Sequence, residues 1–277
     1  MSMQCVNFDR AFERYLSAWM KEHAGEYRDY DAMEAAMPEV YAAFLSQPAP
    51  WLDGEKPGEY FAKYRDAGEL VQWMREYFSQ RVPVPDMLLN RIAELGAAAE
   101  APLLRLLEEN ESQETRMTAV NLLREIDSAA PMERYIAWQA ARGPGPDELA
   151  DNALDSLASL GERAVEKMRA ALPGATPDGQ EALLALLADY PGDEAVFQAA
   201  LSLFSARRDR AALLAGCLGK LGDDRALPAL MARAASEETP YRDYIEMRNA
   251  IERLGGDAPE RDFQAPDPAY DALRDRQ

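Results

Sequence analysis

The dipeptide Leu-Gly recurs along this chain at nearly constant intervals, and this repetition limits the possible folds more than any other feature. It closes a helix-like run at four places, which are Leu95-Gly96, Leu160-Gly161, Leu221-Gly222 and Leu254-Gly255. Ile126-Asp127 and Pro191-Gly192 fall between them in the same phase, so that successive marks lie 30–34 residues apart. A period of this length is typical of stacked helix pairs, because one pair is too small to bury its own apolar face. The sequence therefore predicts a repeat protein.

The composition favours helices throughout. Long runs of leucine and alanine are interspersed with glutamate and arginine, and few segments are rich in valine, isoleucine and threonine. Apolar residues make up 48% of the chain, which is ample for a core. We therefore expect an all-α protein.

The repeats are expected to cover residues 82–255 as five helix pairs and part of a sixth. The pairs are 85–95 with 98–109, 113–126 with 131–141, 147–160 with 162–172, 178–189 with 193–205, and 209–221 with 223–235, followed by one helix at 240–254. The glycine after a first helix suits the left-handed position that ends many helices. Residues 256–277 contain few apolar anchors and are expected to form a loosely docked or frayed tail.

The first 81 residues differ from the repeats, because they hold most of the aromatic side chains. Helices are expected at 7–23, 29–46, 58–65 and 66–80, with a turn-rich loop at 47–58. Asn7 and Asp66 are candidate N-caps, and Pro38 predicts a kink or break inside the second helix. The region 1–81 is thus expected to form a separate helical cap.

One stretch resembles a known repeat family. Residues 217–231, CLGKLGDDRALPALM, and residues 250–255, AIERLG, are similar to the bacterial HEAT repeat first noted in phycobilin lyases. The fit is weaker in pairs one to four, where Asp127 and Pro191 replace the glycine step. The resemblance implies a right-handed α-α superhelix, a HEAT-like solenoid, whose second helices line the concave side. It does not imply lyase activity, since many binding proteins share this repeat. We recognise no family in residues 1–80.

The residues that most enzymes need are scarce. The chain has one histidine, His23, so paired histidine metal motifs and Cys/His zinc clusters cannot be built. His23 lies at the expected end of the first helix, where it suits the helix dipole. The sequence contains no phosphate-binding glycine loop and no 12-residue calcium loop. We therefore expect no catalytic residues, no cofactor and no metal.

The formal net charge is −19, and the acidic residues are spread along the whole chain. Such a chain repels phosphate backbones and anionic lipids, so nucleic acid is an unlikely partner and no membrane is expected. No apolar run approaches the about 18 residues that span a bilayer, and the N-terminus does not resemble a signal peptide. Cys5 and Cys217 do not form a C-x-x-C motif, which favours a reduced, bacterial-type cytoplasm.

A cationic and aromatic stripe is the best candidate binding surface. Arg134, Trp138 and Arg142 are spaced i, i+4 and i+8, and Tyr135 lies three residues before Trp138. Arg169 and Arg233 on later second helices could extend the stripe. Such a ladder could bind an acidic or aromatic peptide through cation–π contacts. Alternatively, Trp138 packs against the next repeat and the arginines are solvated.

Trp51 marks a second candidate contact site, in the loop at 47–58. The alternative is that this tryptophan closes the N-terminal end of the stack, since repeat arrays need end caps.

These observations favour a non-enzymatic scaffold that binds a protein or peptide on its concave face. The acidic charge has two interpretations, which are simple solubility and a basic partner. One alternative is a HEAT-like nucleic-acid-binding protein, in which Arg134, Arg142, Arg169 and Arg233 would form the basic track. Another is an enzyme that uses carboxylates and tyrosines near Asp53, Tyr60 and Tyr64. The sequence does not identify the partner.

Overall fold

The computed structural model describes residues 5–23, 25–27, 29–108, 110–261 and 263. These residues form fifteen α-helices and five short 3-10 helices and contain no strand, so the expected all-α class is confirmed. Packing contacts divide the chain into unit 1, Met1–Ala130, and unit 2, Pro131–Gln277. This division differs from the boundary expected near residue 81, and that domain assignment stays a prediction.

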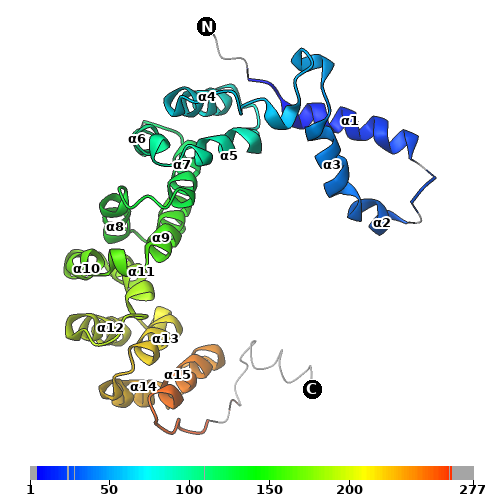
Figure 1. Cartoon of the computed structure of the whole chain (residues 1–277). Helices are drawn as coiled ribbons and strands as arrows, with labels where there is room; N and C mark the ends of the chain where they lie inside the picture. The colour runs from blue at the N-terminus through cyan, green and yellow to red at the C-terminus, as the bar shows by residue number, and fades with distance from the viewer. Residues whose placement is uncertain (1–4, 24, 28, 109, 262, 264–277) are drawn as a thin grey trace. The chain divides into compact units, whose positions relative to one another are not determined.

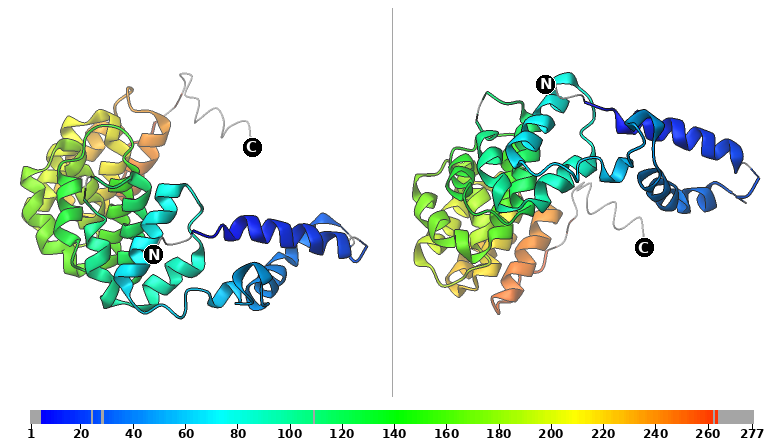
Figure 2. Two further views of the ribbon diagram at one scale, coloured as in Figure 1. Left: turned by 90° about the horizontal axis from the view of Figure 1, so that it is seen from above. Right: turned by 45° about the horizontal axis from the view of Figure 1, so that its top comes forward.

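Unit 1 begins with three helices, α1 (Phe8–Glu22), α2 (Tyr30–Ala35) and α3 (Met37–Ser46). The Asn7 side chain accepts a hydrogen bond from the Arg10 amide at 2.8 Å, which confirms the predicted cap. The expected helix at 29–46 is broken at Ala36, and Pro38 lies in the first turn of α3, where its missing amide is tolerated. Helix α1 lies beside α3 (Figures 1 and 2).

The helix expected at 58–65 is absent, and this prediction was wrong. Only a 3-10 turn forms, at Pro57–Glu59, after a similar turn at Pro50–Leu52. The next backbone bonds join the Ala62 amide to Glu59 and the Tyr64 amide to Phe61, which is turn spacing. Phe61 and Tyr64 in this segment pack against Trp73, so tertiary packing overrides the local helical preference.

Four more helices complete unit 1. They are α4 (Ala67–Gln80), α5 (Asp86–Glu94), α6 (Ala97–Arg105) and α7 (Gln113–Glu125), and α4 packs against each of the other three. The Asp66 carboxylate accepts a hydrogen bond from the Glu69 amide at 3.1 Å, as expected for the cap of α4. Helices α5 to α7 lie close to the ranges expected from the repeat.

Unit 2 contains eight α-helices that follow the expected pairs closely. They are α8 (Met132–Ala140), α9 (Glu148–Leu160), α10 (Glu162–Ala171), α11 (Pro177–Leu187), α12 (Glu194–Ala206), α13 (Ala211–Leu221), α14 (Leu227–Ala234) and α15 (Tyr241–Arg253). The other 3-10 turns are Leu172–Gly174, Arg208–Arg210 and Asp224–Ala226. Figure 1 shows the helices of unit 2 in two layers, with α8, α10, α12 and α14 on the outer side of its bend. The resemblance had placed these second helices on the concave side.

The marks of the repeat coincide with a change in backbone conformation. All six have positive φ angles, at Gly96, Asp127, Gly161, Gly192, Gly222 and Gly255. Asp127 has a φ of 54°, although side chains with a Cβ rarely adopt this region, which supports its assignment to the repeat in the place of a glycine. Five of these six residues directly follow a helix or its C-cap residue, whereas Gly192 lies five residues after the end of α11.

Ion pairs in unit 2 recur at the same interval as the repeat. Five of them join an acidic residue to a basic residue 29–34 positions later, and they are Glu133–Lys167, Asp178–Arg207, Glu181–Arg210, Asp189–Lys220 and Glu194–Arg225. We call this set the ion-pair ladder. Most of its side chains are exposed, so each rung contributes little stability alone. The ladder nevertheless shows that adjacent helix pairs are in register.

The first part of the C-terminal tail is docked on unit 2. The Arg261 guanidinium donates to the Thr239 carbonyl at 2.8 Å and lies 4.4 Å from the centre of the Phe263 ring. The Tyr244 hydroxyl donates to the Pro259 carbonyl at 3.0 Å. The remaining part of the expected tail, 264–277, lies outside the described residues.

Candidate functional site

The predicted stripe on α8 is only partly formed. Arg134 and Trp138 are half-buried, Tyr135 is buried, and the Tyr135 and Trp138 ring centroids are 5.6 Å apart. Helix α8 ends at Ala140, so Arg142 lies beyond the helix and does not continue its face. The role of these residues in binding stays a prediction.

Two of the other candidate arginines are neutralised by carboxylates. Arg142 pairs with Asp151 and donates to Gln139 at 3.3 Å, and its side chain is only 13% exposed. Arg169 pairs with Glu166 at 2.8 Å and with Asp193 at 3.3 Å. Arginines that are already paired in this way do not present a continuous basic track.

Trp51 in unit 1 is 43% exposed. Its ring stacks on Phe44 with centroids 6.2 Å apart and meets Phe8 edge-on at 5.8 Å. One face of Trp51 is therefore anchored in the aromatic core, and the rest of the ring is accessible. Its roles as a contact site for a partner and as an end cap of the repeats both stay predictions.

The tyrosines proposed for an alternative enzyme are packing residues. Tyr60 and Tyr64 meet Trp73 edge-on, with ring centroids 6.0 Å and 5.1 Å apart. Asp53 is exposed in a turn with a φ of 53°. Burial is the main cause that raises the pKa of Tyr60, which opposes its use as a base near neutral pH.

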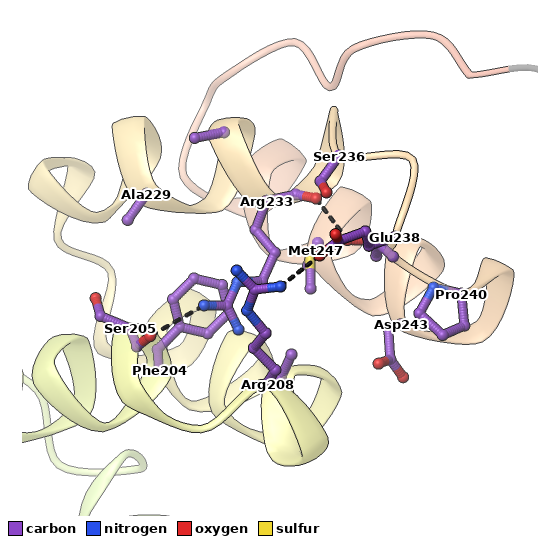
Figure 3. Close-up of a pocket in the computed structure, with 13 residues that line it drawn as sticks. Phe204, Ser205, Arg208, Ala229, Arg233, Ser236, Glu238, Pro240, Asp243 and Met247 are labelled. Atoms are coloured by element: carbon purple, nitrogen blue, oxygen red, sulfur yellow. Dashed lines mark hydrogen bonds and ion pairs between the residues drawn. The ribbon is translucent and has the colours of Figure 1, made fainter.

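A pocket in unit 2 brings together one candidate residue and several that the sequence did not suggest (Figure 3). It is an open cavity of about 400 Å³ between α12, α14 and α15. Its apolar wall is Phe204, Ala211, Ala229, Ala232, Pro240 and Met247, and its charged residues are Arg208, Arg233, Glu238 and Asp243. We call this cavity the Arg233 pocket.

Arg233 is held in the pocket by an aromatic ring and a carbonyl. Its guanidinium carbon lies 4.7 Å from the centre of the Phe204 ring, and its Nη2 donates to the Ser205 carbonyl at 3.1 Å. Its Nη1 is buried and has no hydrogen-bond partner among the described residues. Burial, with a smaller effect of the neighbouring Arg208 charge, lowers the pKa of Arg233. The pocket thus contains a cationic group whose hydrogen bonding is incomplete.

Arg208 completes the cationic side of this pocket. It lies beside Arg233 in Figure 3 and pairs with Glu238, but both partners of this pair are largely exposed. Arg208 and Glu238 were not expected from the sequence, because they lie in the connections after α12 and α14. The signal for Arg208 was the Arg207-Arg208-Asp209-Arg210 run, which carries three cations in four residues.

Comparison with known proteins does not assign the chain to a family. No protein-family model matches the sequence, and no curated protein is similar to it. Across the part of the chain that the structure describes, no group of three His, Cys, Asp or Glu side chains is arranged to hold a metal ion. None of the described helices is both long enough and apolar enough to cross a membrane.

Cys217 on α13 provides a test of burial in unit 2. Burial is the main cause that raises the pKa of its thiol from 9.0 to about 11. Above pH 9 the unfolded chain loses this proton while the folded protein keeps it, so stability falls as the pH rises. We expect wild type to lose about 2 kcal/mol more unfolding free energy than Cys217→Ala between pH 8 and pH 11. Urea unfolding of both proteins would measure this difference, and parallel pH curves would contradict it.

Proposed function

We propose that this chain is a non-enzymatic helical-repeat scaffold that binds a protein or peptide partner. Its repeats are of the HEAT-like kind and wind into a right-handed superhelix, with the aromatic-rich helices at the N-terminus as a cap. The proposal is supported by the 30–34-residue repeat, by helices that follow it, and by an ion-pair ladder in the same register. Repeat stacks of this kind commonly offer extended binding surfaces.

The observation that carries this proposal is the incomplete bonding of Arg233. A buried guanidinium N–H without an acceptor is destabilising, because the group loses water without gaining a partner. Native proteins retain few such groups, and each calls for an explanation. A partner that supplies the acceptor would remove this cost on binding. We therefore place the binding site at the Arg233 pocket, on α12, α14 and α15, instead of on the face expected from the sequence.

The cellular location in this proposal is the cytoplasm. Cys5 and Cys217 are both free thiols in the structure, which agrees with a reducing compartment.

A site-specific photocrosslink tests the proposed function. A photoreactive amino acid would replace the exposed Ala232, which lines the pocket, in cells that naturally make the protein. The matched control carries the same group at Leu213, which is 39% exposed on α13 and does not line the pocket. We expect one stoichiometric protein adduct at Ala232 and none at Leu213. The captured protein would then be purified and its binding to the full chain measured.

The possible results separate the function from its location. An adduct at Leu213 alone, with a purified partner that binds, would support the scaffold function and reject the pocket. If no purified partner binds while the chain turns over a small molecule, the scaffold proposal is wrong.

A further inference from the structure

The interface between α12 and α14 contains the same arginine–phenylalanine arrangement twice. Arg225, just before α14, lies 4.5 Å from the centre of the Phe197 ring, and Arg233 lies 4.7 Å from the centre of the Phe204 ring. Both phenylalanines are buried. The chain therefore provides an internal comparison for the environment of Arg233.

The two arginines differ in their acidic partners. Arg225 pairs with Glu194 and with Asp223, each at 2.6 Å. Arg233 forms no ion pair with any carboxylate of the described residues, and the charged side chain beside it is Arg208. Two adjacent guanidinium groups, one of them with an unused buried N–H, form a site that favours an anion.

An exposed ion pair lies beside Arg233. The Arg208 side chain is 79% exposed, and its partner Glu238 is 76% exposed. An exposed pair of this kind is weak, so a ligand can replace Glu238 without a large cost. Arg208 is then available to bind the same anion as Arg233.

The remaining residues of the pocket limit the nature of the anion. Glu238 and Asp243 also line it, and their charges would repel a doubly charged phosphate more strongly than a single carboxylate. Phe204, Pro240 and Met247 offer an apolar wall next to the arginines. The volume of about 400 Å³ suits the end of a peptide rather than a folded domain.

From these contacts we infer that the Arg233 pocket binds a carboxylate carried next to an apolar side chain, as presented by the C-terminal residue of a partner protein. Arg233 and Arg208 bind the carboxylate oxygens, because a guanidinium matches a carboxylate with two parallel hydrogen bonds. The apolar wall receives the terminal side chain. This inference rests on the proposed scaffold function and adds the chemistry that the partner must present.

Two peptide pools test the inference directly. One is a randomised pool of acetylated hexapeptides with free C-termini, and the other is the same pool with amidated C-termini. Full-length protein would be mixed with each pool, and the retained peptides identified by mass spectrometry. We expect retention of free-acid peptides that end in an apolar residue, and loss of these peptides from the amidated pool. Enrichment of Asp or Glu beside an apolar residue in the amidated pool would overturn the assignment to a C-terminal carboxylate, because a side chain would then be the source.

Three variants connect the binding to particular side chains. Arg233→Gln should lower the affinity for the retained peptides about tenfold or more, because a charge-assisted hydrogen bond is lost. Arg225→Gln is the matched control and should leave binding unchanged, since this arginine already has two carboxylates. Glu238→Gln should strengthen binding about twofold to fivefold, because it removes a competing anion from an exposed position.

The inference would be overturned if both peptide pools were retained equally without acidic enrichment. It would also be overturned if Arg233→Gln bound the peptides with wild-type affinity, or if Glu238→Gln bound them no more tightly than wild type. The last variant remains informative if Arg233→Gln fails to fold, because Glu238 is exposed. A crosslinked partner whose affinity is unchanged by Arg233→Gln would leave the scaffold function standing and reject only the carboxylate site.

Discussion

Gly179→Ala is expected to destabilise unit 2 by about 2–3 kcal/mol. A Cβ atom at this position would lie 2.4 Å from the Gln139 carbonyl oxygen and 2.9 Å from that of Ala140. Both neighbours are backbone atoms, so no side chain can rotate away. The Thr176 amide donates to the Ala140 carbonyl at 2.9 Å and holds the start of α11 against the end of α8. Urea unfolding would measure the loss, and hydrogen exchange would locate it in α8 and α11.

Gly216→Ala is the matched control for this prediction. Gly216 lies inside α13, and a Cβ there would meet no atom within 4 Å. Because alanine favours the helix over glycine, this variant should be unchanged or more stable by about 0.5–1 kcal/mol. If Gly179→Ala were as stable as Gly216→Ala, this result would contradict the close contact between α8 and α11 at Gly179.

Trp73→Ala is expected to destabilise unit 1 by about 3–5 kcal/mol. Trp73 is 4% exposed and lies at the centre of the aromatic core. Its ring is within 5.1 Å of both Phe61 and Tyr64, measured between centroids, and it also meets Tyr60. Removing it leaves a cavity that rigid rings cannot fill. Urea unfolding followed by far-ultraviolet circular dichroism would measure the effect, with hydrogen exchange of α4 as a local readout.

Trp51→Ala is the comparison for Trp73→Ala. Trp51 contacts Phe8 and Phe44 with one side of its ring and is partly exposed on the other. We expect a loss of about 2 kcal/mol, smaller than for Trp73, because 43% of the Trp51 surface stays in contact with water in the folded protein. If both variants lowered the unfolding free energy equally, Trp73 would not be the centre of the aromatic core of unit 1.

The helix boundaries of unit 2 could be predicted from the sequence because local signals agree with one another. Asp193 caps α12, Gly161 separates α9 from α10, and both signals lie at the phase of the repeat. The segment 58–65 could not be predicted in this way. Its backbone follows the packing of Phe61 and Tyr64 on Trp73, which depends on a partner in a later helix.

The candidate site was predictable only in part. Arg142 was expected to continue the α8 stripe, but the chain leaves the helix at Ala140 and turns this side chain towards Asp151. Arg233 was selected for its charge, and its pocket depends on the packing of three helices that no local pattern specifies. One local signal was present, since Asp223 lies two residues before Arg225 whereas no acidic residue lies that close to Arg233.

The ion-pair ladder has a direction along the chain. In each of its five rungs the carboxylate belongs to the earlier part of the sequence and the cation to the later part, as in Glu133–Lys167 and Glu194–Arg225. The pair Arg208–Glu238 has the same spacing but the opposite order, with the cation first. If helix pairs were exchanged by recombination, opposite charges would meet at a new junction only where both helix pairs carry the same order of acid and base. The order of charges in each ion pair thus limits which helix pairs can be neighbours, independently of the loops that connect the helices.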